Sequence, residues 1–149
     1  KEKNWTPENY PILRYADVLL MLAEAENEAN QGPTDLAYEC INTIRKRAGI
    51  SELSGLSYVD FQQAVRDERA RELCFESLRK YDLVRWGIYV EAIHDKLGAA
   101  TQDSRWATGN NYIGAKDYAA RTQEKHQFLP IPTKELDVNG KLQQNKYWQ

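Results

Sequence analysis

One stretch, residues 68–87, constrains the fold of this chain more than any other, because it places many charges in a helix with apolar neighbours. Read at about 100° per residue, the helical face that carries Tyr58, Phe61 and Val65 continues into a charged stripe. Leu73 and other apolar side chains point in other directions, which predicts burial on several sides. Isolated buried charges are very costly, so we expect these charges to pair. We call the predicted set the ion-pair lattice; it consists of Glu68, Arg69, Glu72, Glu76, Arg79, Asp82 and Arg85.

The spacing of apolar residues predicts four helices, at residues 13–30, 36–48, 58–79 and 81–97. Gln31-Gly32-Pro33 ends the first helix, and Thr34 or Asp35 is available to cap the second. Residues 15–48 therefore form a helical hairpin of tetratricopeptide-repeat length. Ser57 is the expected N-cap of the third helix.

The remainder of the chain has a weaker pattern. Residues 99–125 are rich in Gly, Asn, Thr, Asp and Ser, which predicts a long irregular segment. Residues 126–132 form an extended run between prolines, and residues 133–138 form one helical turn. With no convincing strand ladder, the sequence predicts a single all-α domain over residues 1–149, with helical hairpins of tetratricopeptide-like type, two further helices and a long loop.

Composition and cysteine usage exclude several classes of protein. The chain has 20 basic and 22 acidic residues and no basic stripe, so we expect no nucleic-acid partner. No apolar run approaches the roughly 20 residues of a membrane span. Cys40 and Cys74 are far in sequence from both histidines, so no metal site is expected. Buried free thiols are the expected state, and a Cys40–Cys74 disulfide is the alternative.

Four blocks of sequence resemble the C-terminal region of the SusD/RagB family, in the family's order. They are YPILRYADVLLMLAEA (residues 10–25), INTIRKRAG (residues 41–49), the charged stretch ending in DLVRWG (residues 68–87) and HQFLPIP (residues 126–132). Two departures affect local turns: Ser77 replaces a frequent Gly, and Asn145-Lys146-Tyr147 replaces a usual Asn-Pro-Gly-Tyr ending. The resemblance implies that the family's N-terminal part, with its lipid-anchoring cysteine, is absent from this chain.

The resemblance further implies a role in nutrient uptake. Members of the family are lipoproteins on the extracellular face of the outer membrane of Gram-negative bacteria, where they capture glycans or other nutrients. Their usual partner is a TonB-dependent, SusC-like transporter. The family implies no covalent chemistry and no cofactor, and its membrane association would come through the absent lipid anchor.

The candidate ligand-binding residues are Trp106, Asn110, Asn111 and Tyr112. Aromatic faces stack on sugar rings and amides bond to hydroxyls, and loops on a rigid scaffold are suitable places to hold both. The alternative is that these loop aromatics simply pack on the scaffold.

Two other functions remain open from the sequence. Glu68, Glu72 and Glu76 recur at four-residue steps, and two carboxylates about 5 Å apart would suit a retaining glycoside hydrolase. Interleaved Arg69 and Arg79 argue against that reading, because they would lower the carboxyl pKa values. A helical-repeat scaffold that binds only protein is the second alternative.

Overall fold

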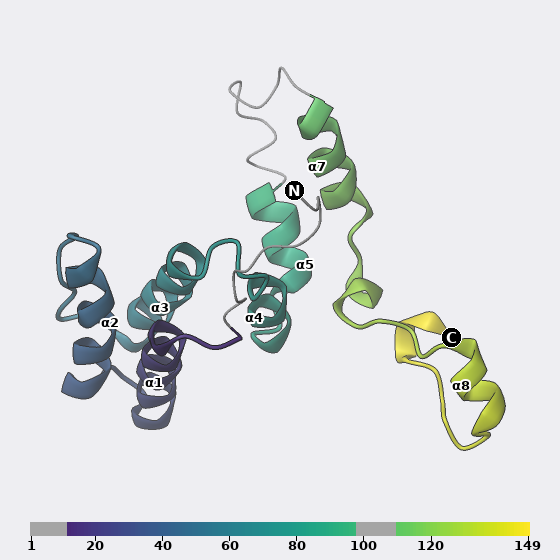
Figure 1. The fold of residues 1–149 in the computed structure, drawn as a ribbon, viewed down its shortest axis with the longest axis horizontal. Helices are drawn as coiled ribbons and strands as arrows, with labels where there is room; N and C mark the ends of the chain where they lie inside the picture. The colour runs from purple at the N-terminus through teal and green to yellow at the C-terminus, as the bar shows by residue number, and fades with distance from the viewer. Residues whose placement is uncertain (1–11, 98–109) are drawn as a thin grey trace, which may run out of the picture. The chain divides into compact units, whose positions relative to one another are not determined.

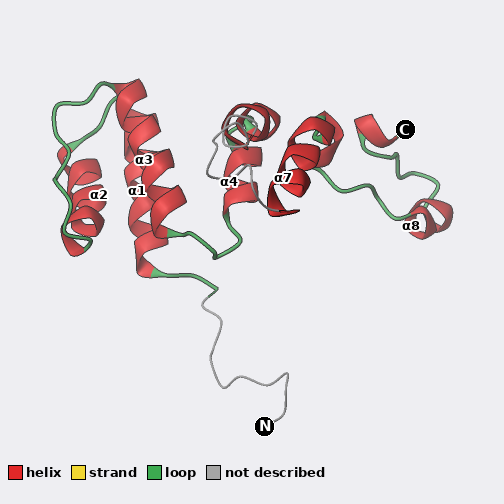
Figure 2. Ribbon diagram, turned by 90° about the horizontal axis from the view of Figure 1, so that it is seen from above, coloured by secondary structure: helices red, strands yellow, loops and turns green. Residues whose placement is uncertain are grey.

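The computed structural model describes residues 12–97 and 110–149. These residues form helices joined by turns and loops, with no strand in either range, which confirms the all-α class (Figure 2). Contacts divide the chain into two compact units, Lys1–Arg79 and Lys80–Gln149, and each is described by itself. The single domain expected from the sequence stays a prediction.

Within the described residues of the first unit lie three helices: α1 (Tyr15–Asn30), α2 (Asp35–Arg47) and α3 (Tyr58–Glu72). Helix α1 packs against both α2 and α3, and the three lie side by side (Figure 1). The predicted hairpin is therefore confirmed, and the ends of its two helices lie within two residues of the predicted positions.

The turn between α1 and α2 is held by local hydrogen bonds. Gln31 adopts a left-handed conformation (φ 53°), and its N–H donates to the Asn27 carbonyl at the end of α1. Thr34 caps α2, because its hydroxyl oxygen accepts a 3.1 Å hydrogen bond from the Ala37 N–H. The same hydroxyl donates to Glu26 at 2.8 Å, so the cap also ties the two helices together.

A side-chain amide holds the loop between α2 and α3. Asn42 donates from Nδ2 to the Leu53 carbonyl at 2.9 Å and accepts from the Leu53 N–H at Oδ1 at 2.8 Å. We call this two-point pairing of an amide side chain with one backbone residue an amide clamp. Ser57 then caps α3, as predicted, accepting a 3.2 Å hydrogen bond from the Asp60 N–H.

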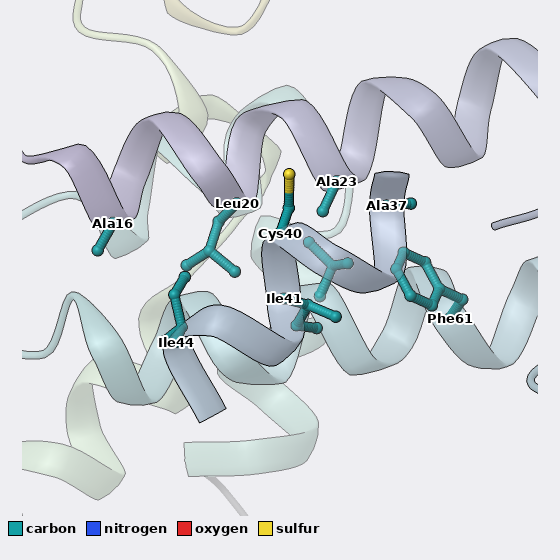
Figure 3. Packing of buried hydrophobic residues seen from close by; sticks show 9 residues of the cluster. Ala16, Leu20, Ala23, Ala37, Cys40, Ile41, Ile44 and Phe61 are labelled. Atoms are coloured by element: carbon teal, nitrogen blue, oxygen red, sulfur yellow. The ribbon is translucent and has the colours of Figure 1, made fainter. Parts of the chain in front are cut away.

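The core of the first unit is built from one face of each helix (Figure 3). Phe61 of α3 meets Tyr38 of α2 edge to face, with ring centroids 5.0 Å apart. Burying each large apolar side chain contributes about 1.5–3 kcal/mol to stability. Cys40 belongs to this core, whereas Cys74 is exposed, and both are free thiols. The nine core residues are Ala16, Leu20, Ala23, Ala37, Cys40, Ile41, Ile44, Phe61 and Val65.

The third helix is shorter than predicted. We expected it to run to residue 79, but α3 ends at Glu72, and Phe75 and Ser77 take positive φ values of 66° and 63°. The guanidinium of Arg14 donates to the Glu72 carbonyl at 2.9 Å, which supplies a partner for a carbonyl at the helix end. This long-range contact stabilises an ending that local propensity does not encode.

The second unit also departs from the sequence prediction. The single helix expected at 81–97 is wrong, because Gly87 (φ 70°) separates α4 (Arg79–Arg85) from α5 (Tyr89–Ala92), which continues into the π-helix η1 (Ile93–Leu97). The irregular segment expected at 99–125 is wrong in its second half, which forms α7 (Asn110–Arg121). Alanines at 115, 119 and 120 favour helix there, and they outweigh the Asn and Gly residues. Residues 99–109 lie outside the described part of the chain.

The C-terminal segment contains three short helices, η2 (Glu124–Gln127), α8 (Thr133–Val138) and η3 (Lys146–Trp148). The helical turn predicted at 133–138 is confirmed, whereas the extended run begins only after η2. A second amide clamp ties the tail to this run: Gln144 donates to the Ile131 carbonyl at 2.9 Å and accepts from the Ile131 N–H at 2.8 Å.

Candidate functional site

The second unit contains a cleft of about 480 Å³, formed by α7, residues 126–130 and the C-terminal turn. That volume lies within the roughly 300–1,000 Å³ of pockets that bind small molecules. Its lining combines aromatic side chains with aliphatic and polar ones. The aromatic side chains are Tyr89, Tyr118, His126, Phe128 and Trp148.

Two tyrosines are joined at the wall of the cleft. The Tyr89 ring is buried and the Tyr118 ring is half-exposed, and their hydroxyl oxygens are 2.5 Å apart. Burial, together with the hydrogen bond to Tyr118, raises the pKa of Tyr89 to about 12. This hydroxyl therefore stays protonated near neutral pH and presents a fixed donor or acceptor rather than a charge.

Trp148 is oriented by the backbone around η2. Its Nε1 donates to the carbonyls of Lys125 at 2.9 Å and Phe128 at 3.1 Å. The His126 ring meets it edge to face, with centroids 6.2 Å apart. His126 Nδ1 accepts a 2.9 Å hydrogen bond from the Gln123 N–H, so Nε2 carries the proton and is a donor.

The charged side chains of the lining carry both signs of charge. The Lys80 ammonium lies 5.4 Å from the centroid of the Tyr89 ring, a cation–π distance. Asp117 and Arg121 lie one turn apart on α7 and are 3.6 Å from each other. The cleft can therefore offer apolar ring faces to one side of a ligand and hydrogen-bond donors and acceptors to its edge.

The ion-pair lattice does not line the cleft. Several of its members instead join helices of the first unit to one another. Glu68 of α3 accepts from Arg45 of α2 at 2.8 Å, and Arg71 approaches it at 3.4 Å. Arg69 of α3 donates to Asp17 of α1 at 2.7 Å. These contacts tie α3 to both of its neighbours.

Arg14, just before α1, forms ion pairs with Glu72 and Glu76. Its guanidinium bonds Glu76 through two nitrogens, at 2.7 and 2.9 Å, and lies 3.0 Å from Glu72. Burial opposes ionisation of Glu72, but hydrogen bonds from Arg47 and Arg14 outweigh it and lower the pKa of this carboxyl. A general acid of a glycosidase needs the opposite shift, so Glu72 is not arranged to act as one.

The last members of the lattice have other partners. Arg79 donates to the Arg66 carbonyl at 3.1 Å. In the second unit, Arg85 donates to Asp82 at 3.0 Å, and its guanidinium carbon lies 4.7 Å from the centroid of the Trp86 ring. In the described ranges, no group of three His, Cys, Asp or Glu side chains is placed to hold a metal ion.

Residues 1–148 match the sequence profile of the SusD family. This chain belongs to the SusD family. Among curated relatives, it is 40% identical over 139 residues to SusD-like protein P25 of Formosa agariphila, covering 91% of this chain and 23% of that protein. It is 32% identical over 145 residues to SusD-like protein P2 of the same organism, covering 92% and 25%. The chain thus spans about a quarter of the length of these relatives.

Solved structures of SusD-family proteins share the fold. A SusD homologue from Bacteroides thetaiotaomicron matches with a TM-score of 0.77 and 37% identity, over 90% of this chain and 26% of that one. A SusD superfamily protein from Bacteroides vulgatus matches with a TM-score of 0.65 and 33% identity, over 91% and 27%. The resemblance found in the sequence motifs is therefore confirmed.

The candidate ligand-binding residues of this SusD-family chain lie at the edge of what the structure describes. Trp106 falls outside the described residues. Asn110, Asn111 and Tyr112 form the first turn of α7, and their side chains are likewise outside the description. The later turns of the same helix line the cleft. The assignment of these four residues to a ligand site stays a prediction.

Sequence reasoning missed most of the cleft. Gly114, Tyr118 and Arg121 follow a helical i, i+4, i+7 spacing, which would have placed them on one face had residues 110–121 been read as a helix. Trp148 lies 20 or more residues from its hydrogen-bond partners, so no local pattern could place it. The lattice partners Arg14, Asp17, Arg45 and Arg47 were missed for the same reason.

Proposed function

We propose that this chain is part of a glycan-binding or other nutrient-binding protein that captures its ligand without covalent chemistry. The observation that carries the proposal is membership of the SusD family over nearly the whole chain. The aromatic cleft of the second unit supports it, because pyranose rings present apolar C–H faces with hydroxyls at their edges. Such a ring suits a pocket whose lining combines aromatic rings with charged groups.

The complete protein would act at the cell outer membrane, on its extracellular face. We propose that it is a lipoprotein held by an N-terminal lipid anchor and that it delivers its ligand to a TonB-dependent, SusC-like transporter. In the described ranges, no helix is both long and apolar enough to cross a bilayer. Trp106, Asn110, Asn111 and Tyr112 are proposed to contribute to ligand binding as well.

Isothermal titration of the complete protein against plant, host and microbial oligosaccharides tests the proposal. At least one glycan is expected to bind, and Tyr118→Ala with Trp148→Ala is expected to weaken binding tenfold or more. Tyr81→Ala, which removes an exposed aromatic outside the cleft lining, serves as the matched control. Binding that only Trp106→Ala with Tyr112→Ala abolishes would move the site away from the cleft. A complete protein that binds no glycan, but whose transporter complex forms, would favour the protein-interaction scaffold.

A further inference from the structure

The lining of the cleft in the second unit carries more positive than negative charge. Of the described side chains that line it, Lys80 and Arg121 are cationic and Asp117 is the one carboxylate. All three residues are exposed, so their charged groups are accessible to a ligand. This part of the lining is therefore net positive, although the whole chain has a net charge of −2.

The carboxylate of the cleft is paired only weakly with one of the two cations. Asp117 lies 3.6 Å from the guanidinium of Arg121, and the two side chains are 58% and 82% exposed. Water screens an ion pair of this kind, so it contributes little. Lys80 has no carboxylate partner among the described residues, and its ammonium lies over the Tyr89 ring instead. One positive charge at the cleft therefore stays without a compensating negative charge from the described lining.

The residues beside the lining add a further cation. The Lys125 ammonium lies 5.2 Å from the centroid of the Trp148 ring, which is part of the lining. Glu124, the acidic residue next to Lys125, is not among the described lining residues, and it accepts a hydrogen bond from the Gln127 amide. A concave surface with cations in excess raises the local concentration of anionic ligands.

The neutral groups of the cleft also supply hydrogen-bond donors. His126 Nε2 carries a proton, because Nδ1 accepts from the Gln123 N–H. The hydroxyls of Tyr89 and Tyr118 together carry two protons near neutral pH, and the hydrogen bond between them uses only one. A ligand that enters the cleft therefore meets donors from an ammonium, a guanidinium, an imidazole and a phenol.

An excess of donors distinguishes between classes of saccharide. A sugar hydroxyl donates as well as accepts, so a neutral sugar needs acceptors as well as donors in its site. The oxygens of a carboxylate or a sulfate ester only accept. Hydrogen bonds from Lys or Arg to anionic oxygens are also about twice as strong as hydrogen bonds between neutral groups.

We infer that the ligand of the cleft is an acidic saccharide, whose carboxylate or sulfate ester is bound by Lys80 and Arg121. The apolar face of the sugar ring would lie against an aromatic side chain of the lining. This inference rests on the proposed function, because it names the class of glycan that the same cleft binds.

Isothermal titration of the complete protein against acidic oligosaccharides and their neutral forms tests the inference. Each uronic acid of the panel, oligogalacturonate among them, is compared with its methyl ester. Each sulfated sugar, a sulfated galactan among them, is compared with its desulfated form. At least one acidic form is expected to bind tenfold or more tightly than its neutral form. The first comparison reports a carboxylate and the second a sulfate ester.

Two double variants locate the preference in the cleft. Lys80→Gln with Arg121→Gln is expected to remove it, so that the acidic and neutral forms bind almost equally. Both residues are exposed, so this variant should fold, and its circular dichroism is compared with that of the natural protein. Lys134→Gln with Lys141→Gln is the matched control, because it removes two exposed charges of the second unit that are not among the described lining residues. The control should keep the preference.

The possible results separate this inference from the proposed function. Glycan binding with equal affinity for acidic and neutral forms would overturn the inference and leave the proposed function intact. A preference for acidic forms that survives in Lys80→Gln with Arg121→Gln would also overturn it. Binding of no glycan at all would contradict the proposed function, and the inference with it.

Discussion

Arg69 of α3 and Asp17 of α1 form a 2.7 Å ion pair, and both residues are buried. The two residues are 52 positions apart, so the pair fixes the register of α3 against α1. A charge in such a position is tolerated only when its partner is present, because desolvating it alone is very costly.

Removing one partner of this pair is expected to destabilise the protein strongly. Arg69→Met leaves Asp17 as a buried carboxylate without its guanidinium, and about 3–5 kcal/mol of the free energy of unfolding should be lost. The double variant Asp17→Leu, Arg69→Met should recover much of that loss, because neither member of the pair is then left as a buried charge without the other. Urea unfolding of the four proteins in the cycle measures the coupling. If the changes in the free energy of unfolding caused by the two single substitutions simply added up in the double variant, Asp17 and Arg69 would not be coupled, which would contradict the prediction.

The Ser77→Gly variant is expected to be more stable than the natural chain by about 1 kcal/mol. Ser77 has φ 63°, a left-handed conformation that costs a side-chain-bearing residue about 1–2 kcal/mol and costs glycine almost nothing. Ser54→Gly is the matched control, since Ser54 is exposed and is not among the residues with positive φ; it should be neutral or slightly destabilising. Thermal unfolding compares the two. A lower melting temperature for Ser77→Gly would contradict the backbone argument.

Acidification is expected to weaken the first unit through Glu72. Arg47 and Arg14 lower the pKa of this carboxyl in the folded protein, whereas the unfolded chain keeps a value of about 4.3. The stabilisation is therefore complete above about pH 4.3 and is lost as the pH falls through the folded pKa. Denaturant titrations at a series of pH values measure the free energy of unfolding. As the pH falls, this free energy should decrease less steeply in Glu72→Gln than in the control Glu52→Gln, which removes an exposed carboxylate. An equal dependence of the free energy of unfolding on pH in the two variants would contradict the role given to Glu72.

Alkaline titration is expected to report the tyrosine pair of the cleft. The pKa of Tyr89 is about 12 in the folded protein and about 10 in an unfolded chain, so stability should fall as the pH rises between these values. Tyr118→Phe removes the hydroxyl partner and should move the pKa of Tyr89 downwards, leaving only the effect of burial. The absorbance of tyrosinate follows both titrations. An unchanged Tyr89 pKa in Tyr118→Phe would show that burial alone sets the value.

Local sequence was sufficient for the first two helices but not for the third. The Gly and Thr signals around Gln31 and Thr34 are complete within five residues, and the structure places the turn there. The end of α3 depends on Arg14, which is 58 residues away from the carbonyl it bonds, so no window of sequence contains the signal. The charged stretch likewise predicts that its charges pair, but the partners of Glu68, Arg69 and Glu76 include Arg45, Asp17 and Arg14, which lie far away in sequence.

The cleft was harder to predict because its residues come from distant segments. Tyr89 and Tyr118 are 29 positions apart, and each alone is an ordinary helical aromatic. The prediction that residues 106 and 110–112 bind a ligand rests on their aromatic and amide side chains and on the expectation that this segment is irregular. A helix over residues 110–121 would point to Tyr118 as a candidate instead, because it lies two turns after Asn110 and Asn111 and lines the cleft together with Thr122.

The two amide clamps are points at which a chemical change of one side chain would alter the structure. Asn42 and Gln144 each stand in for a β-bridge, with one amide nitrogen donating and one amide oxygen accepting from a single backbone residue. Deamidation turns that nitrogen into a negatively charged oxygen, which would face the Leu53 or Ile131 carbonyl and repel it. Hydrolysis of either amide to a carboxylate would therefore loosen the loop before α3 or the C-terminal tail at the point where the clamp holds it.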